Sequence, residues 1–275
     1  MIAWAAALEA ASRARVTLVL GPSDTGKTSL TTLLAAALAE QGPTAVVDAD
    51  LGQSEIGPPT TIGLGRARPR LARLADAEVL ALEFVGTTTP VRNMKGTTRA
   101  TKALVDRALA AGFEHVVVDT CGLVAGGLAQ AFRRAQIDLV SPDLLVALQR
   151  AGEVEHILAV YAAAGRPPLV RLGPLPGVVK RSQAERRRRR ESALAAYFAP
   201  ARSVEVGVER IAPERVRPED TLDDALVGLR DAKGETLGIG RISAVDVAGG
   251  RLTIVTPVDG TRIDAVTPGS EKYRG

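Results

Sequence analysis

The feature that most constrains the fold is the stretch Gly21-Pro-Ser-Asp-Thr-Gly-Lys-Thr28, which fits the pattern G-x-x-x-x-G-K-[ST]. An apolar run over residues 15–20 precedes it, and residues 28–40 follow with helical spacing. Between a strand and a helix, such a loop wraps the β-phosphate of a nucleotide with consecutive backbone N–H groups and the helix N-terminus. Lys27 is expected to bridge the β- and γ-phosphates, and the Thr28 hydroxyl to bind Mg²⁺. The residues expected to hold the nucleoside triphosphate are Gly21, Pro22, Ser23, Asp24, Thr25, Gly26, Lys27, Thr28 and Ser29.

Short apolar runs alternate with helical patterns through the first two thirds of the chain. This alternation predicts an α/β fold of the P-loop NTPase type, with a mostly parallel sheet flanked by helices and ligands at the carboxyl ends of the strands. Strands are expected at 15–20, 44–48, 78–84, 115–119, 143–148 and 168–172, and helices at 28–40, 98–111, 153–164 and 182–198. Beyond residue 200 the pattern becomes β-rich, with strands expected at 225–230, 236–247, 251–257 and 262–266 and hairpin turns at 231–234 and 248–250.

Composition excludes several classes of protein. The 275-residue chain has one cysteine and two histidines, too few for an internal disulfide or a zinc site of the usual kind, so Cys121 and His115 are expected to be structural. No apolar run reaches the roughly 18 residues of a membrane helix, and residues 1–11 lack a signal-peptide pattern, so we expect a cytoplasmic protein that does not engage membranes. The net charge is +4, arginine outnumbers lysine 29 to 6, and only 3% of residues are aromatic. Any nucleic acid would therefore be held mainly by its phosphates.

Three aspartates lie at the ends of two expected strands. Asp48 and Asp50 belong to the stretch Asp-Ala-Asp-Leu-Gly-Gln53, and Asp119 ends the strand over residues 115–119. A carboxylate near a γ-phosphate can accept the proton of an attacking hydroxyl or hold the magnesium shell, and a neighbouring amide can orient the acceptor. The residues alone do not assign these roles uniquely, and a solvated turn is the alternative for residues 48–53. Thr28, Asp48 and Asp119 are the candidate metal ligands.

Two further segments carry polar groups that suit a substrate. Residues 84–93 offer hydroxyls, an arginine and the only asparagine of the chain, Asn93, although an ordinary turn would have the same composition. Residues 177–190 form a loop leading into a basic helix. If that loop folds over the nucleotide as a lid, Arg181 and Arg186 can stabilise charge on the transferring phosphoryl group. For Arg187–Arg190 we expect a diffuse attraction of phosphates, with a solvated helix face as the alternative.

Together these motifs resemble the polynucleotide 5′-hydroxyl kinases, a family that includes the kinase subunit of the messenger-RNA cleavage complex and the kinase of ribosomal-RNA spacer processing. The resemblance extends from Gly21 to about Pro257 and is carried by the phosphate loop together with four other stretches. These are Asp48-Ala-Asp-Leu-Gly-Gln53, Phe84-Val-Gly-Thr-Thr-Thr-Pro90, Asp119-Thr-Cys-Gly122, and Gly177-Val-Val-Lys-Arg181-Ser182 with Arg186 and Tyr197-Phe198.

The resemblance implies a role for each matching residue. Asp50 corresponds to the acid that activates the 5′-hydroxyl, and Gln53 helps to place the acceptor end. The threonine–proline clasp on the acceptor corresponds to Thr88, Thr89, Pro90 and Asn93, and the lid arginines to Arg181 and Arg186. A tryptophan that stacks on the acceptor base in several relatives falls at Leu123, which offers apolar contact without a ring. The amino-terminal β domain that helps relatives to hold the donor base is not expected here, because the first strand begins near residue 15. The choice between ATP and GTP stays open.

We therefore expect a P-loop kinase domain with an arginine lid over residues 1–200 and a small β-rich domain over residues 201–275. The expected activity transfers the γ-phosphate of ATP or GTP, with Mg²⁺, to the 5′-hydroxyl of single-stranded or end-exposed RNA or DNA. The expected catalytic residues are Lys27, Asp50, Gln53, Arg181 and Arg186, and the expected substrate-binding residues are Thr88, Thr89, Asn93 and Leu123. The alternatives are a P-loop NTPase switch, which would use water as acceptor, a nucleotide-binding scaffold in RNA processing, and a kinase of a small metabolite.

Overall fold

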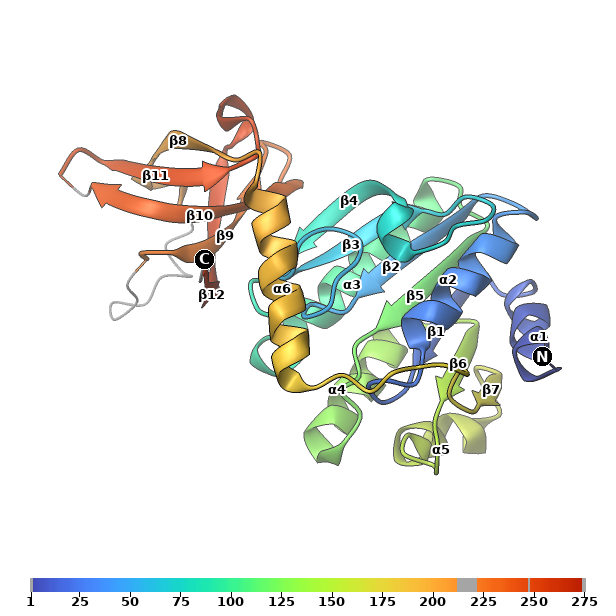
Figure 1. Ribbon diagram of the computed structural model, residues 1–275. Coiled ribbons are helices and arrows are strands. Elements are labelled where there is room, and N and C mark those ends of the chain that lie inside the picture. Colours follow the sequence, from blue (N-terminus) through green and yellow to red (C-terminus); the bar gives the residue numbers. More distant parts are fainter. Residues whose placement is uncertain (1, 212–221, 247, 274–275) are drawn as a thin grey trace.

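One continuous sheet runs through the molecule, with α1 near one end and the last strands of the chain at the other (Figure 1). The structure is a computed structural model that describes residues 2–211, 222–246 and 248–273. Within those residues twelve strands are hydrogen-bonded, in the order β12-β9-β10-β4-β3-β2-β5-β1-β6-β7, and β11 and β8 extend from β10. No helix among them is both long and apolar enough to cross a membrane.

Five parallel strands form the half of the sheet that carries the phosphate loop. They are β2 (Thr44–Ala49), β5 (His115–Thr120), β1 (Val16–Leu20), β6 (Leu144–Leu148) and β7 (Leu169–Leu172). Strands β1 and β6 are buried along their whole length, as expected for a parallel sheet covered on both faces. The register pairs Asp48 with Asp119, so the two candidate carboxylates leave neighbouring strands side by side. The predicted P-loop α/β fold is confirmed.

Helices cover both faces of this half. α1 (Ile2–Ala11) and α2 (Lys27–Leu38) pack on one face, and α3 (Met94–Ala110), α4 (Gly126–Val140) and α5 (Glu155–Ala164) on the other. α2 buries leucines at four-residue spacing, the apolar stripe expected of a helix on a sheet. The sequence patterns did not predict α1 or α4. α1 is apolar nearly all round, and α4 begins with two glycines and has no side-chain cap, so neither helix has a clear start signal.

Two antiparallel strands extend the sheet beyond β2. β3 (Thr61–Arg66) pairs with β2, and β4 (Glu78–Phe84) pairs with β3, so the expectation of a mostly parallel sheet holds only as far as β2. β3 escaped prediction because two of its six residues are glycines. A Cβ at Gly63 would lie 1.9 Å from the carbonyl oxygen of Ile56, so the close passage of residue 56 requires glycine there.

The C-terminal strands continue this sheet. β8 (Arg202–Gly207), β9 (Ala225–Arg230), β10 (Thr236–Asp246), β11 (Arg251–Thr256) and β12 (Ala265–Lys272) are antiparallel around a separate apolar cluster. The predicted hairpin turns between β9 and β10 and between β10 and β11 are confirmed, although β8 was not predicted and the expected strand end at Val247 lies outside the described residues. We call residues 202–211, 222–246 and 248–273 the C-terminal unit.

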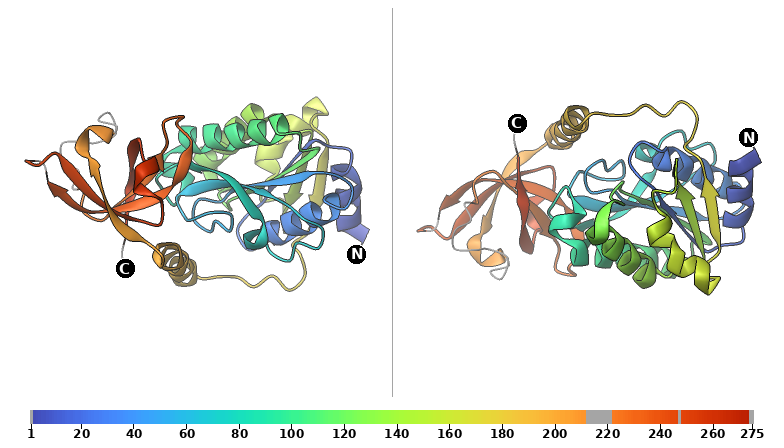
Figure 2. Two further views of the ribbon diagram at one scale, coloured as in Figure 1. Left: turned by 90° about the horizontal axis from the view of Figure 1, so that it is seen from above. Right: turned by 90° about the horizontal axis from the view of Figure 1, so that it is seen from below.

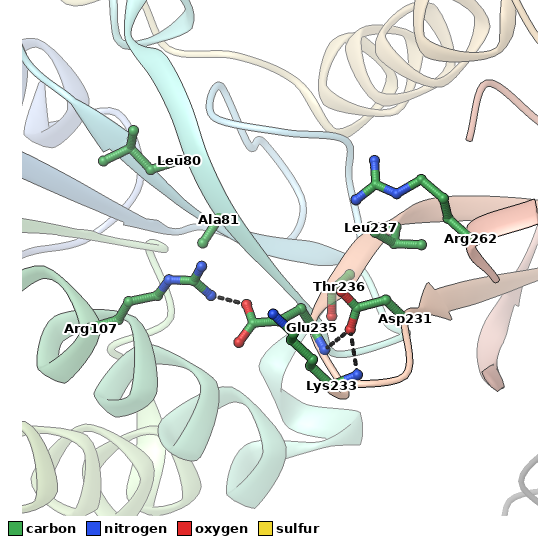
Figure 3. A pocket seen from close by; sticks show the side chains of 9 residues that line it. All are labelled: Leu80, Ala81, Arg107, Asp231, Lys233, Glu235, Thr236, Leu237 and Arg262. Atoms are coloured by element: carbon green, nitrogen blue, oxygen red, sulfur yellow. Dashed lines mark hydrogen bonds and ion pairs between the residues drawn. The ribbon is translucent and has the colours of Figure 1, made fainter. Parts of the chain in front are cut away.

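The C-terminal unit joins the rest of the sheet through β10 and β4, where Thr236 pairs with Leu82. Figure 3 shows the cavity of about 530 Å³ at this junction, where Arg107 of α3 and Glu235 form an ion pair across the boundary. The C-terminal unit is therefore joined to the main sheet by the pairing of β10 with β4 and by this ion pair beside it.

The segment after β7 runs along the outside of the molecule, past the phosphate loop, and leads into α6 (Gln183–Phe198) (Figures 1 and 2). Ser182 and Glu185 form a capping box that fixes the start of α6. The other end of the helix rests on the C-terminal unit, where the Tyr197 hydroxyl accepts a hydrogen bond from the Ile239 amide at 2.9 Å. The predicted helix over residues 182–198 is confirmed, and it spans from the phosphate loop to the C-terminal unit.

Candidate active site

The phosphate loop connects β1 to α2 with the backbone that the motif requires. Gly26 is left-handed, with φ 89°, and directly precedes α2. A Cβ at Gly21 would lie 2.3 Å from the carbonyl oxygen of Leu148, so glycine is required where β6 passes the loop. The Lys27 ammonium donates to the carbonyl of Pro22 at 2.8 Å, which holds it over the loop. Burial lowers the pKa of Lys27, and the nearby Asp119 and Asp50 oppose this shift.

Asp119 lies directly beside the first turn of α2. Its carboxylate accepts a hydrogen bond from the Thr28 hydroxyl at 2.7 Å and one from the Thr31 hydroxyl at 3.3 Å. The pKa of Asp119 is raised to about 6. Burial is the main cause, and the hydrogen bond from Thr28 and the charge of Lys27 limit the rise. A hydroxyl and a carboxylate in contact beside a phosphate loop form an oxygen pair of the kind that holds Mg²⁺ together with phosphates and water.

Asp48 and Asp50 face different partners. Asp48 is fully buried and accepts hydrogen bonds from the backbone amides of Asp50, Glu55 and Ile56, which folds residues 50–56 back over it. Burial, together with the charge of Asp119, raises its pKa to about 8. Asp50 accepts from the amides of Gly52 and Gln53 through one oxygen only, at 3.0 Å each. These contacts favour a structural role for Asp48 and leave a carboxylate oxygen of Asp50 available.

The segment Thr87–Pro90, which we call the clasp, follows β4. It packs against residues 50–56, which we call the Asp50 loop. A Cβ at Gly52 would lie 2.7 Å from the carbonyl oxygen of Thr88, so the two loops touch. Asn93 caps α3 by accepting from the Gly96 amide at 3.0 Å, and its own amide group donates to the carbonyl of Val85 at 3.1 Å. Both ends of its side-chain amide are therefore engaged within the protein.

Residues 121–124 follow β5 and pass behind the phosphate loop. A Cβ at Gly122 would lie 2.1 Å from the Ser23 hydroxyl oxygen, so this backbone rests directly on the loop. The fully buried Arg133 of α4 holds the segment from behind by donating to the carbonyls of Leu123 and Cys121. Cys121 is buried, in agreement with a structural role, and Leu123 is partly exposed.

The segment between β7 and α6, which leads into the predicted lid over residues 177–190, packs on the phosphate loop. The Leu175 amide donates to the carbonyl of Thr25 at 3.0 Å, and Leu175 and Val178 lie within 3.0 Å of where a Cβ at Gly26 would stand. Arg186 forms an ion pair with Asp24 at 2.5 Å, a contact in which Asp24 is only 10% exposed. The Gln53 side chain donates to the carbonyl of Arg186 at 3.1 Å, which ties the Asp50 loop to the first turn of α6.

A cavity of about 1010 Å³ joins these elements. Among the predicted catalytic residues it is lined by Lys27, Asp50, Gln53, Arg181 and Arg186. The predicted acceptor residues Thr88, Thr89, Asn93 and Leu123 do not line the cavity in the described structure, although Thr88 touches its wall at Gly52 and Leu123 adjoins the lining residue Gly122. The structure thus brings together, in one cavity, the residues predicted to bind the donor, to act as the base and to form the lid.

Sequence reasoning missed several residues that line this cavity. Arg189 and Arg190 of α6 line it with Arg186 and Ala193, a spacing of three, four and seven residues that a helical wheel places on one face. The four arginines for which we expect a diffuse attraction of phosphates therefore differ in position: Arg189 and Arg190 line the cavity, whereas Arg187 pairs with Glu191 at 2.7 Å. Trp4, Leu33 and Leu175 add an apolar stretch of wall, and Trp4 escaped notice because α1 was not predicted.

Within the described residues no group of three or more His, Cys, Asp or Glu side chains could hold a metal ion by itself. Mg²⁺ does not require such a cage, because it usually binds one or two protein oxygens and completes its shell with phosphates and water. The contact between Thr28 and Asp119 fits that requirement, and the chemistry of the donor set matches the ion.

The family model of the mRNA cleavage and polyadenylation factor CLP1 P-loop matches residues 21–200. The chain belongs to this family. Its polyribonucleotide 5′-hydroxyl-kinase relative from Pyrococcus furiosus is 32% identical over 199 residues, which cover 70% of this chain and 53% of that protein. The relative of the same name from Methanocaldococcus jannaschii is 35% identical over 145 residues, 52% of this chain and 40% of that one. The chain thus spans about half the length of these two relatives.

A longer match within the CLP1 P-loop family is to the polyribonucleotide 5′-hydroxyl-kinase of Pyrococcus horikoshii, 27% identical over 298 residues, 88% of this chain and 81% of that protein. Among solved structures, Clp1p in the wild-type Clp1p–Pcf11p complex superposes with a TM-score of 0.71 at 16% identity, covering 94% of this chain and 74% of that one. This likeness confirms the fold, and the family match confirms the resemblance that the motifs predicted.

Proposed function

We propose that the protein is a polynucleotide 5′-hydroxyl kinase, which transfers the γ-phosphate of ATP or GTP to the 5′-hydroxyl end of RNA or DNA. The observation that carries this proposal is the single cavity in which Lys27, Asp50 and Arg186 meet. A phosphate-binding lysine, a carboxylate and a lid arginine are the parts that phosphoryl transfer to a hydroxyl requires. The names of the archaeal relatives, polyribonucleotide 5′-hydroxyl-kinases, support RNA as an acceptor.

The donor triphosphate would lie on the phosphate loop. Its β-phosphate would accept from the backbone amides at the start of α2, and Lys27 would exchange its bond to the carbonyl of Pro22 for the β- and γ-phosphates. Thr28 and Asp119 would hold Mg²⁺, which when bound neutralises charge on the phosphate oxygens. The nucleoside would extend along α2 toward Trp4 and Leu33, because these residues form an apolar part of the cavity wall.

Asp50 would accept the proton of the attacking 5′-hydroxyl. The amides of Gly52 and Gln53 fix one of its carboxylate oxygens, and the other has no hydrogen-bond partner in the described part of the chain. The free oxygen can therefore receive the hydroxyl proton as the oxygen–phosphorus bond forms. A base fixed in this way costs no reorganisation at the moment of reaction.

Arg186 would stabilise the charge that spreads over the transferring phosphoryl group. Its guanidinium is held at the cavity by the ion pair with Asp24, at the edge of the phosphate loop. A γ-phosphate carries more charge than one carboxylate, so the guanidinium would turn from Asp24 toward the donor when it binds. Arg181 would assist from the lid, and Arg189 and Arg190 would draw the phosphates of the acceptor strand.

One experiment tests the proposed reaction. The protein is incubated with γ-labelled ATP or GTP and Mg²⁺, together with RNA or DNA oligonucleotides that end in a 5′-hydroxyl or a 5′-phosphate. Label is expected on hydroxyl-ended strands and absent from phosphate-ended ones, and Asp50→Asn should abolish it. Release of labelled inorganic phosphate at the same rate with either strand, or with none, would favour the switch NTPase instead.

A further inference from the structure

The last strand of the chain contacts the clasp through its backbone. The pairing of β12 with β9 shifts register between Pro268 and Lys272, and the intervening residues turn toward Gly86. The Ser270 amide donates to the carbonyl of Gly86 at 2.7 Å, and a Cβ at Gly269 would lie 2.8 Å from the same oxygen. Backbone meets backbone here, so the β12 irregularity and the start of the clasp are fixed relative to one another.

Glu271 carries the contact onto the clasp itself. One carboxylate oxygen lies 3.2 Å from the Thr88 hydroxyl, 3.3 Å from the Thr88 amide nitrogen and 3.4 Å from the Thr87 hydroxyl, all of which can donate to it. Arg92 lies 3.6 Å from the same oxygen, and the Glu271 side chain is 24% exposed. A carboxylate that accepts from the amide and the hydroxyl of Thr88 beside a guanidinium holds its partners in one geometry.

Thr88 connects the clasp to Asp50, the proposed base. Its carbonyl oxygen is packed on the Cα of Gly52, and the Gly52 amide is one of the two that orient the Asp50 carboxylate. Two residues beyond Glu271, the ring of Tyr273 packs edge-on against Phe198 at the far end of α6, with centroids 5.2 Å apart. The end of β12 therefore contacts both the clasp and the helix that carries the lid arginines.

We infer that Glu271 is a positioning residue of the acceptor site, one that fixes the clasp so that the 5′-hydroxyl end is presented to Asp50. The inference rests on the proposed function. It gives the C-terminal unit a part in acceptor binding that no motif assigns to it. Removing the carboxylate leaves the Thr88 amide and the Arg92 guanidinium without their partner, so the clasp loses its fixed geometry while the phosphate loop keeps its own.

Steady-state kinetics of Glu271→Ala and Glu271→Gln test the inference. Glu271→Ala is expected to raise the KM for hydroxyl-ended oligonucleotides about tenfold and to change the KM for the nucleotide less than about twofold. Glu271→Gln should fall between, because its amide oxygen still accepts from Thr88 but carries no charge toward Arg92. The matched control is Glu205→Gln on β8, an exposed residue whose one ion pair within the described residues is a 3.9 Å contact with Arg251. Equal changes in both KM values, or an unchanged acceptor KM, would overturn the assignment.

Backbone amide exchange at Thr88 and Thr89 gives a readout that does not depend on catalysis. Exchange should accelerate in Glu271→Ala and stay unchanged in Glu205→Gln, at equal thermal stability. If the unaltered protein transferred no phosphate, the proposed function would fail while the exchange result would still support or overturn the role of Glu271. Unaltered exchange in Glu271→Ala would show that the clasp is held without this carboxylate and would overturn the inference.

Discussion

The two walls of the cavity are built in different ways. The donor wall comes from consecutive residues 21–29, whose geometry depends mainly on one strand, one helix and two glycines. The proposed acceptor wall combines the Asp50 loop and the start of α6, which line the cavity, with the clasp and the end of β12, which support them without lining it. In that wall Thr88 and Glu271 are in contact although they stand 183 residues apart in the chain.

This difference has a physical consequence. The donor wall gains its shape from local backbone conformation, so it is specified wherever the motif occurs between a strand and a helix. In the acceptor wall, the clasp and the preceding Gly86 also depend on hydrogen bonds to Glu271 and Ser270 of the C-terminal unit, which docks on β4. Substitutions remote from the reacting atoms should therefore affect acceptor binding more readily than donor binding.

The largest effect is expected at Asp50, where the walls meet. Asp50→Asn should lower kcat by at least about 10²-fold, the usual scale for loss of a general base, while nucleotide affinity persists. The measurements are kcat with hydroxyl-ended strands and the Kd of the nucleotide. Asp106→Asn on the exposed face of α3, where Asp106 pairs with Lys102, is the control and should change neither value. Full activity in Asp50→Asn would disprove its assignment as the base.

The second effect separates arginines within α6. Arg186→Ala should lower kcat by about 10- to 100-fold, because hydrogen bonds to charged groups contribute about 1.5–3 kcal/mol and this one strengthens in the transition state. Arg188→Ala is the control, since Arg188 is exposed and does not line the cavity in the described structure. Arg190→Ala should mainly raise the KM of the oligonucleotide and weaken its salt dependence. Equal losses of kcat in all three variants would contradict this division.

The contrast between the two walls also explains which parts of the molecule could be predicted from the sequence. The parallel strands and the phosphate loop follow from local patterns, because buried apolar runs and a glycine motif determine them. β3 could not be predicted, because two of its residues are glycines. Gly63 and Gly65 leave room for Ile56, which passes close to the strand, and the sequence alone does not show this contact. The involvement of Glu271 was equally hidden, since a single carboxylate near the chain end carries no pattern of its own.

The role of Asp48 shows the same limit within the site. The residues alone did not separate the roles of Asp48 and Asp50, and only the resemblance implied that Asp50 is the base and left Asp48 as a candidate metal ligand. The structure differentiates them through three backbone amides that donate to Asp48 and fold the next loop over it. Which carboxylate becomes buried is decided by that loop, and loop conformation of this kind depends on tertiary contacts more than on local propensity.

The third prediction tests whether the walls are electrostatically coupled through Asp48 and Asp119. Asp48 keeps its proton in the folded state up to about pH 8, against an ordinary value of 3.8, so the folded chain binds more protons than the unfolded chain between these limits. The contribution of Asp48 to the free energy of unfolding is therefore largest at low pH and is lost as pH rises through this window. Denaturant unfolding from pH 5 to 8, without nucleotide or Mg²⁺, should show this fall.

Asp48→Asn should flatten that fall, with differences on the order of 1 kcal/mol per pKa unit involved. Asp119→Asn should flatten it partly, because removing the neighbouring charge lowers the pKa of Asp48. If unaltered protein and Asp48→Asn had parallel pH profiles, Asp48 would not be the group that titrates.

The fourth prediction concerns the donor wall alone. Trp4→Ala should raise the KM of the nucleotide several-fold and leave the KM of the oligonucleotide unchanged, because the indole lines the cavity beside Leu33 and packs with Leu175 on the same apolar cluster. Trp4→Phe keeps an aromatic face and should recover most of the affinity. A change in the oligonucleotide KM instead would move the base-binding wall to the acceptor side.

The smallest effect is expected at Leu123, which adjoins the lining residue Gly122 and is proposed to face the acceptor end. The backbone there is fixed from both sides: Arg133 donates to the Leu123 carbonyl at 3.0 Å, and Gly122 rests on Ser23. Leu123 is partly exposed, so we expect that a larger ring extends toward solvent instead of overpacking the core. Because a stacked base contributes about 1–3 kcal/mol, Leu123→Trp should lower the oligonucleotide KM several-fold.

Three measurements on Leu123→Trp decide this prediction: the two KM values and the melting temperature. The nucleotide KM should stay constant, since the donor lies on the phosphate loop, and the gain for the acceptor should become sensitive to the identity of its 5′ base. In the unaltered protein, acceptor affinity should be strongly salt-dependent and nearly indifferent to that base, because phosphate contacts dominate. A markedly lower melting temperature without tighter acceptor binding would place the ring in the core. The acceptor wall would then lie farther from residue 123 than its neighbour Gly122 suggests.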